Sequence, residues 1–366
     1  MHKFVEEFTD RMIKDTIKND KIFGVDQYNN QKLEYPECYS KFLISLYYKN
    51  KIHKDEVYKE YAKKYIEYML NLANETDDYI YWGLPYNWGE TKVEDGFLLT
   101  TAFCLKSLCL WYKEGVFTDE KIIQKVINWC MALLHNNNDD EYGFYYSKKL
   151  KQNIYNATSI ACGVLATNNE FLSPIESKKL EKVISTLIKV QKSGYWNYSS
   201  VKVDVDLLHQ CYTCEGIFEY YNKTKNEIAL NSATSGIDFL IQNEKFINIE
   251  RYLFNLSDPE KFNVRFKYLL LKMYSKTREN EKRFTKTRAW SYGAYVRTLI
   301  YSYYFTNNRK YKTRLEEILI HVEKNIIKDG NVLFQSGGNN VYVRNSYHLL
   351  ESLCLFEYFN TTGEIE

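Results

Sequence analysis

The chain has 366 residues, of which 45% are hydrophobic and 26% are charged, and this composition is typical of a folded globular protein and excludes a disordered one. Its 49 basic and 47 acidic residues leave a net charge of +2, so overall charge does not direct it to nucleic acid. With only 15 Gly and 4 Pro, the chain lacks the turn formers that a many-stranded sandwich or barrel needs. We therefore expect long helices joined by compact loops.

Apolar residues recur at helical spacing in twelve segments, and we expect a helix in each. In chain order these segments are 3–18, 37–50, 54–74, 91–114, 118–135, 153–167, 173–191, 204–223, 226–243, 287–306, 308–327 and 341–360. A further helix is expected near 259–275, after Pro259. No segment alternates with period two for long enough to predict a core strand.

Two kinds of helix alternate along the chain. The segment 97–105 is nearly free of charge, whereas the segment 55–64 is rich in Lys and Glu. A helix that is apolar on most faces is buried, and a helix that is apolar on one face lies at the surface. Six buried helices alternating with six surface helices predict an all-α fold, a single (α/α)6 toroid domain spanning residues 1–366 with an extra helix near 259–275. An open α-solenoid is the alternative, but its repeats are usually shorter and both helices of each pair are amphipathic.

Short aromatic segments accompany the starts of the buried helices, at 85–89, 143–147, 194–199, 289–293 and 332–336. In a closed ring the loops that enter the inner helices meet at one end, so we expect a shared aromatic funnel there. Aromatic faces stack on sugar rings and on isoprenoid chains, although the same side chains would also serve as a core plug. The side chains expected to bind a substrate are Trp88, Tyr146, Trp196, Tyr198, Trp290, Tyr292, Arg297, Arg344, Tyr347 and His348.

Acid/base chemistry is indicated most sharply by Asp206 and His209. Their i, i+3 spacing places a carboxylate and an imidazole on one helix face, where they can act together as general acid and base. The adjacent acids Glu94 and Asp95 offer a second carboxylate, as glycoside hydrolysis requires. The structural alternatives are that Asp206 is a helix N-cap, that His209 is a core histidine, and that the acidic pair only complements a helix N-terminus.

The eight cysteines lie in apolar helical positions, which predicts reduced thiols in the core of a cytoplasmic protein. Cys211 and Cys214 have the spacing of a metal or redox pair, but no second pair supplies further zinc ligands and no strand precedes them. We therefore expect neither a metal site nor a cofactor. The N-terminal residues include acids where a signal peptide needs an apolar run, and no segment approaches the ~18 apolar residues of a membrane span.

A family resemblance rests on the run Gly-Tyr-Trp-Asn-Tyr-Ser at 194–199, followed by Asp206-x-x-His209 and a helix ending in Phe-Glu-Tyr-Tyr at 218–221. This pattern resembles the α/α toroids of the terpenoid cyclase/prenyltransferase-like and six-hairpin glycosidase-like families. Within them it is most similar to uncharacterised proteins associated with bacterial capsule and exopolysaccharide biosynthesis. The resemblance covers about residues 80 to 360 through short motifs.

The sequence departs from two of the activities found in such toroids. Class II terpene cyclases carry Asp-x-Asp-Asp, whereas Asp204-Val205-Asp206-Leu207 lacks the last acid. Protein prenyltransferases hold zinc through an Asp-x-Cys pair, and no such pair occurs in the expected funnel helices. Both departures argue against isoprenoid chemistry.

The resemblance and the funnel residues together imply a carbohydrate-active protein. It would bind an oligosaccharide or polysaccharide and hydrolyse, eliminate or epimerise it by acid/base chemistry, with Asp206, His209, Asp95 and Glu94 as catalytic candidates. One alternative is a non-enzymatic scaffold that binds a glycan or a partner in the same funnel. Another is an isoprenoid-handling enzyme that meets a diphosphate with Arg283, Lys286 and Arg288.

Overall fold

A computed structural model describes residues 2–136, 141–202, 205–243, 250–252 and 286–365. These residues form twelve α-helices: α1 (His2–Asn19), α2 (Pro36–His53), α3 (Glu56–Leu70), α4 (Leu98–Lys113), α5 (Glu120–Ala132), α6 (Tyr155–Thr167), α7 (Pro174–Lys189), α8 (Leu207–Thr224), α9 (Glu227–Gln242), α12 (Ala289–Thr306), α13 (Arg309–Asn325) and α14 (Val343–Thr362). The helix expected near 259–275 lies outside the described residues.

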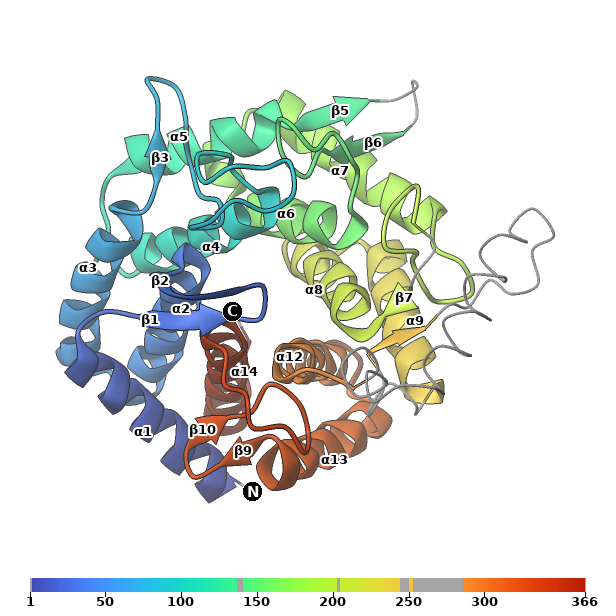
Figure 1. Ribbon diagram of the computed structural model, residues 1–366. Coiled ribbons are helices and arrows are strands. Elements are labelled where there is room, and N and C mark those ends of the chain that lie inside the picture. The colour runs from blue at the N-terminus through green and yellow to red at the C-terminus, as the bar shows by residue number, and fades with distance from the viewer. Residues whose placement is uncertain (1, 137–140, 203–204, 244–249, 253–285, 366) are drawn as a thin grey trace.

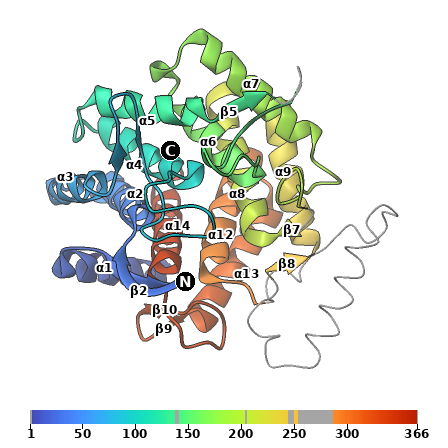
Figure 2. The same ribbon diagram turned by 45° about the horizontal axis from the view of Figure 1, so that its top comes forward.

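The helices form two concentric rings (Figure 1). The inner ring contains α2, α4, α6, α8, α12 and α14, and the outer ring contains α1, α3, α5, α7, α9 and α13. The first and last helices, α1 and α14, pack together and close the ring, and α12 and α14 lie side by side in both ribbon views (Figure 1 and Figure 2). The expected (α/α)6 toroid is confirmed.

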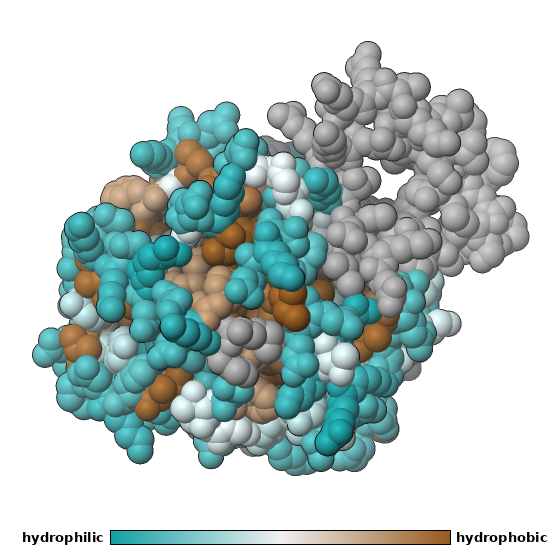
Figure 3. Space-filling model, turned by 90° about the horizontal axis from the view of Figure 1, so that it is seen from below, coloured by the Kyte–Doolittle hydropathy of each residue, from teal (hydrophilic) through white to brown (hydrophobic). Residues whose placement is uncertain are grey.

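The hydrophobic pattern explains the two rings. Almost every residue of the inner helix α4 is buried, whereas the outer helix α5 buries one face. That face consists of Ile123, Val126, Ile127, Trp129 and Cys130. Inner helices also approach one another closely, because a Cβ at Gly216 of α8 would lie 2.2 Å from the backbone of Ser159 in α6. Seen from below, most of the surface is hydrophilic, and apolar residues gather near the middle of that face (Figure 3).

Two-stranded antiparallel pairs lie in the connections between outer and inner helices. They are β1 (Phe23–Asp26) with β2 (Asn29–Glu34), β3 (Asn74–Glu75) with β4 (Ile80–Tyr81), β5 (Leu134–Asn136) with β6 (Tyr142–Phe144), β7 (Val205–Asp206) with β8 (Arg251–Tyr252), and β9 (Ile327–Lys328) with β10 (Asn331–Val332). Each strand is short because it shapes a loop and does not extend a sheet.

The connections differ in length at the two ends of the ring. The inner helices α2, α4, α6, α8 and α12 each pass to the next outer helix through a short connection, such as the turn after α2, where Lys54 adopts the left-handed conformation. The return connections are long and enter the N-termini of the inner helices, and we call this end the mouth. The β1–β2 hairpin lies across the mouth (Figure 1). No helix within the described ranges is long and apolar enough to cross a membrane.

Candidate active site

Four buried carboxylates gather at the mouth, from Asp26, Glu37, Asp206 and Glu250. Six inner helices begin there, and a helix N-terminus carries a partial positive charge that stabilises nearby anions. Glu37 lies in the first turn of α2, and Asp206 is the N-cap of α8. The convergence of helix N-termini therefore gives a physical reason why acids are tolerated in this buried position.

Asp206 and His209 form a hydrogen-bonded pair. The Asp206 carboxylate accepts the backbone N–H of His209 at 2.9 Å, so it caps α8, and its two oxygens lie 2.5 and 2.6 Å from His209 Nδ1. Asp206 is buried, whereas a fifth of the His209 side chain remains exposed (20%). The ring centres of His209 and Tyr198 lie 4.4 Å apart in an edge-to-face arrangement. Asp206 thus fixes the imidazole orientation and leaves Nε2 as the nitrogen available to a substrate.

Arg288 and Glu250 form a second ion pair beside Asp206. The guanidinium of Arg288 donates to Glu250 Oε1 at 2.7 and 3.1 Å, and Ser291 donates to the same carboxylate at 2.7 Å. Burial by itself would lower the pKa of Arg288, but the negative charge of Glu250 has the larger effect and raises it. The nearby charge of Asp206 also raises this pKa. Leu207 also donates its backbone N–H to the Glu250 carbonyl at 2.9 Å, so both charged pairs belong to one electrostatic neighbourhood.

A chain of hydrogen bonds lies directly below, linking Trp290, Tyr212, His348, Glu37 and Arg344. Trp290 donates its indole N–H to the Tyr212 hydroxyl, which lies 2.9 Å from His348 Nδ1. His348 Nε2 lies 2.6 Å from Glu37, and Arg344 donates to the same carboxylate at 2.8 and 2.9 Å. The Trp290 ring stacks on His348 at 4.1 Å, and Arg344 lies 4.5 Å from the centre of the indole.

The direction of this chain determines the tautomer of His348. An indole N–H can only donate, so the Tyr212 hydroxyl accepts from Trp290 and donates its own hydrogen to Nδ1 of His348. Nε2 then carries the single ring proton and donates it to Glu37. Burial lowers the pKa of His348 to about 3, and the pKa of Glu37 falls to about 2 because Arg344 and His348 outweigh its burial. His348 is therefore neutral and Glu37 ionised at neutral pH.

A deeper ionic layer closes the axis of the ring. Arg297 donates to both oxygens of Glu215 at 2.9 Å and to Glu351 at 3.1 Å, and Lys41 pairs with Glu351 at 2.9 Å. All four side chains are at least 98% buried. Arg297 is thus a structural cation beneath the mouth, not a group at its surface.

Helical geometry separates the substrate-binding candidates of α12 and α14. Residues four apart share a face, so Arg344 and His348 both point to the axis, whereas Tyr347 turns outward and its hydroxyl bonds Thr16 at 2.9 Å. Residues two apart lie on nearly opposite faces. Trp290 therefore faces the axis, and the Tyr292 hydroxyl bonds His321 of α13 at 2.9 Å.

The remaining aromatic candidates for substrate binding lie in different environments. Trp196 is only 2% exposed and donates its indole N–H to Leu187 at 2.7 Å, so it packs between α8 and α7. Trp88 is 44% exposed and meets Phe97 edge-on. The Tyr146 carbonyl accepts the backbone N–H of Leu98, the first residue of α4, at 2.9 Å, so Tyr146 lies at the mouth. Burial raises its pKa.

Glu94 and Asp95 lie in the loop before α4 rather than at a helix start. Asp95 accepts the backbone N–H of Lys92 at 2.8 Å and pairs with Lys149 at 2.9 Å. Glu94 is exposed. The structure does not bring either carboxylate into contact with the Asp206–His209 pair.

Sequence reasoning missed Asp26, Glu37 and Glu250 as mouth residues. Glu37 follows Pro36 in the first turn of a buried helix, so an acid at the start of a buried helix is the signal that could have found it. Asp26 and Glu250 lie in connections that become part of the mouth only through tertiary packing. Asp26 pairs with Arg344 at 3.2 Å, across more than 300 residues of sequence.

The sequence predicts that the eight cysteines are reduced thiols in the core. All eight cysteines are buried and free of disulfides, including Cys211 and Cys214, and burial raises the pKa of both thiols. Among the described residues, no group of three or more His, Cys, Asp or Glu side chains is arranged to hold a metal ion.

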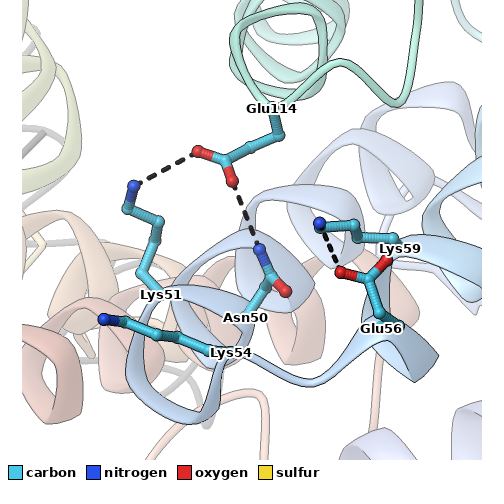
Figure 4. A pocket seen from close by; sticks show the side chains of 6 residues that line it. All are labelled: Asn50, Lys51, Lys54, Glu56, Lys59 and Glu114. Carbon is cyan, nitrogen blue, oxygen red and sulfur yellow. Dashed lines mark hydrogen bonds and ion pairs between the residues drawn. The ribbon is translucent and has the colours of Figure 1, made fainter.

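The opposite end of the ring carries a polar hollow of about 290 Å³ (Figure 4). Lys51 and Asn50 bond Glu114 at 3.2 and 3.4 Å, and Lys59 bonds Glu56 at 2.6 Å. These are partly or fully exposed contacts at the C-terminal end of α2, where no buried acid or histidine joins them. The mouth therefore remains the candidate active site.

Comparisons with known proteins identify the fold. A heparin-specific unsaturated glucuronyl hydrolase aligns over 100% of this chain and 99% of its own, with a TM-score of 0.65 and 14% identity. A cellobiose 2-epimerase from Bacillus thermoamylovorans aligns over 96% and 99%, with a TM-score of 0.68 and 12% identity. A GH76 α-mannanase from Bacteroides thetaiotaomicron aligns over 97% and 96%, with a TM-score of 0.69 and 10% identity.

These structures place the chain in a fold class, the six-hairpin glycosidase-like α/α toroid. No protein-family model matches the chain, and no curated protein matches its sequence. At 10–14% identity the likeness concerns the fold, and the chemistry of this chain must be inferred from its own mouth.

Proposed function

We propose that this protein is a carbohydrate-active enzyme that binds an oligosaccharide or the end of a polysaccharide at the mouth. The proposal is supported first by one observation, the Asp206–His209 pair, in which a buried carboxylate holds a partly exposed imidazole. The fold adds support, since the structures it resembles include a hydrolase, an epimerase and a mannanase that act on sugars. Tyr198, which is half-buried and packs against His209, offers aromatic surface nearby.

In this proposal His209 is the general acid or base that transfers the proton, and Asp206 orients the His209 imidazole. Asp206 binds Nδ1, so Nε2 accepts or donates a proton at the substrate, and the carboxylate stabilises the imidazolium that forms. Two-carboxylate hydrolysis would need a second acid about 5–10 Å away. Glu94 and Asp95 do not contact the Asp206–His209 pair, and Asp95 is held by Lys149. The other acids of the mouth are held in ion pairs, Glu250 with Arg288 and both Asp26 and Glu37 with Arg344. The geometry therefore favours proton transfer at a sugar carbon, as in epimerisation, isomerisation or elimination, over hydrolysis.

The test is product analysis in D₂O. Wild-type protein is incubated with neutral and uronate-containing oligosaccharides, and NMR follows deuterium incorporation at sugar carbons together with new reducing ends. Asp206→Asn should lower turnover by about 10²–10⁴-fold, the usual contribution of positioned acid/base catalysis. Its melting temperature should change little, because Asn is an equally good N-cap.

Asp119→Asn is the matched control, because Asp119 caps the outer helix α5 by the same kind of hydrogen bond. It should leave turnover unchanged. A wild-type protein that binds sugars without turnover, with binding unaffected by Asp206→Asn, would refute the enzymatic proposal and favour a glycan-binding scaffold. Hydrolysis without exchange at carbon would refute the proposed reaction class.

A further inference from the structure

Buried polar atoms without a hydrogen-bond partner in the described structure are concentrated at the mouth. More than about 90% of buried polar groups in proteins are hydrogen-bonded, so such a concentration requires an explanation. Six of these atoms lie in the loops or first helical turns that form the mouth: Asp26 Oδ1, Gln27 Oε1, the Tyr35 hydroxyl, Asn156 Oδ1, Asn197 Oδ1 and Asn345 Nδ2.

These atoms come from five different parts of the chain. Asp26 ends the first strand of the β1–β2 hairpin, Gln27 lies in its turn, and Tyr35 is the N-cap of α2. Asn156 and Asn345 lie in the first turns of α6 and α14, and Asn197 lies in the loop before α8. Only tertiary structure brings them to one end of the ring, where the hairpin lies across the mouth (Figure 1).

The chemistry of the set is biased toward acceptors. Asp26, Gln27, Asn156 and Asn197 each present an oxygen that can only accept, whereas Asn345 alone presents only a donor. A ligand that satisfies them must supply several hydrogen-bond donors. Sugar hydroxyls do so, and they can replace ordered waters that would otherwise satisfy the same atoms.

The charges at the mouth favour a neutral ligand over an acidic one. One oxygen of Asp26 accepts hydrogen bonds from the Arg344 guanidinium at 3.2 Å and from the Tyr86 hydroxyl at 3.0 Å. Glu37 accepts a second hydrogen bond from the same guanidinium, from Nε. An incoming carboxylate would be a third acid beside Arg344, and like charges in a buried site repel strongly.

We propose that the mouth binds a neutral sugar unit through its hydroxyl groups, with Asp26 and Gln27 of the β1–β2 hairpin as acceptors and Tyr35 beside them. This inference rests on the proposed function and specifies its substrate class. It makes the hairpin a specificity element, because two of the acceptors belong to it and Asp26 is fully buried.

The test is calorimetric titration with D-glucose, D-mannose and cellobiose, and with D-glucuronate as the acidic counterpart of glucose. Wild-type protein should bind at least one neutral sugar about 10-fold or more tightly than glucuronate. Tyr35→Phe should weaken that binding about 2- to 10-fold, the effect of losing one neutral hydrogen bond. Asp26→Asn should weaken it about 10-fold or more, because a charged acceptor is lost.

Tyr295→Phe is the matched control for Tyr35→Phe. Both tyrosines are buried and both hydroxyls have no partner in the described structure, but Tyr295 lies on α12 near Arg314 of α13, away from the mouth. Removing an unpartnered hydroxyl should not unfold either variant, so both remain measurable. Tyr295→Phe should bind sugar like the wild type.

The outcomes separate the two proposals. Tighter binding of glucuronate than of every neutral sugar would overturn the substrate class and leave the proposed function standing. Equal affinities of Tyr35→Phe, Tyr295→Phe and wild type would overturn the assigned hydroxyl contacts. Binding of no sugar in the panel would remove the proposed function and this inference together.

Discussion

Acidification should destabilise the folded protein through His348, and the structure permits the size of the effect to be worked out. Protonation of Nδ1 would turn the nitrogen that accepts from Tyr212 into a donor, and the Tyr212 hydroxyl already accepts from Trp290. The hydroxyl would then lose the acceptor for its own hydrogen inside the core. Glu37, Lys41 and Glu351 surround the same imidazole, but burial dominates and lowers the pKa of His348 to about 3.

Proton linkage determines the direction in which the free energy of unfolding changes with pH. An unfolded histidine has a pKa of about 6.5, so between about pH 6.5 and 3 the unfolded chain binds one more proton at His348 than the folded chain. This stabilisation is fully present above pH 6.5 and is lost as the pH falls. Each pH unit in the window removes about 1.4 kcal/mol, so the free energy of unfolding should decrease by about 2 kcal/mol between pH 7 and 5 from this residue.

Urea unfolding of wild type and His348→Gln at pH 7, 6 and 5 measures the effect. Glutamine can still donate to Glu37 but does not titrate, so its free energy of unfolding should fall less steeply than that of wild type, by about 1.4 kcal/mol per pH unit below 6.5. His53→Gln, at an exposed position of α2, should retain the wild-type slope. Parallel slopes for wild type and His348→Gln would refute the neutral, buried imidazole.

Three further predictions test the core. Arg297→Met should destabilise the protein by about 3–5 kcal/mol, because it leaves the buried carboxylates of Glu215 and Glu351 without their main cation; an unchanged melting temperature would contradict the ionic layer. Gly216→Ala should cost about 1–3 kcal/mol despite the higher helix propensity of alanine, since its Cβ would overlap the Ser159 backbone; a more stable variant would show that α6 and α8 are less close. The eight buried thiols should resist a thiol reagent such as DTNB in the folded protein and all react in urea, and rapid labelling of folded protein would contradict their burial.

The sequence alone determined the ring. The all-round apolar character of segments such as 97–105 and the one-sided pattern of segments such as 55–64 are local properties, and each dictates which faces of a helix must leave water. Because these two kinds of helix alternate along the chain, the sequence predicts pairs of one inner and one outer helix. The Asp206–His209 pair was also predictable from local sequence, because the side chain of an N-cap residue lies beside the residue three positions further on.

Tertiary structure alone decided which polar residues face one another at the mouth. Trp290 and Tyr292 are equivalent in the sequence, but the helix rotates one toward the axis and the other toward α13. Asp26 is an ordinary strand residue until the β1–β2 hairpin lies across the ring and carries it to Arg344. Contacts of this kind depend on the rotation of each helix and the path of each long loop. These are set by the packing of the whole ring, which no local pattern encodes.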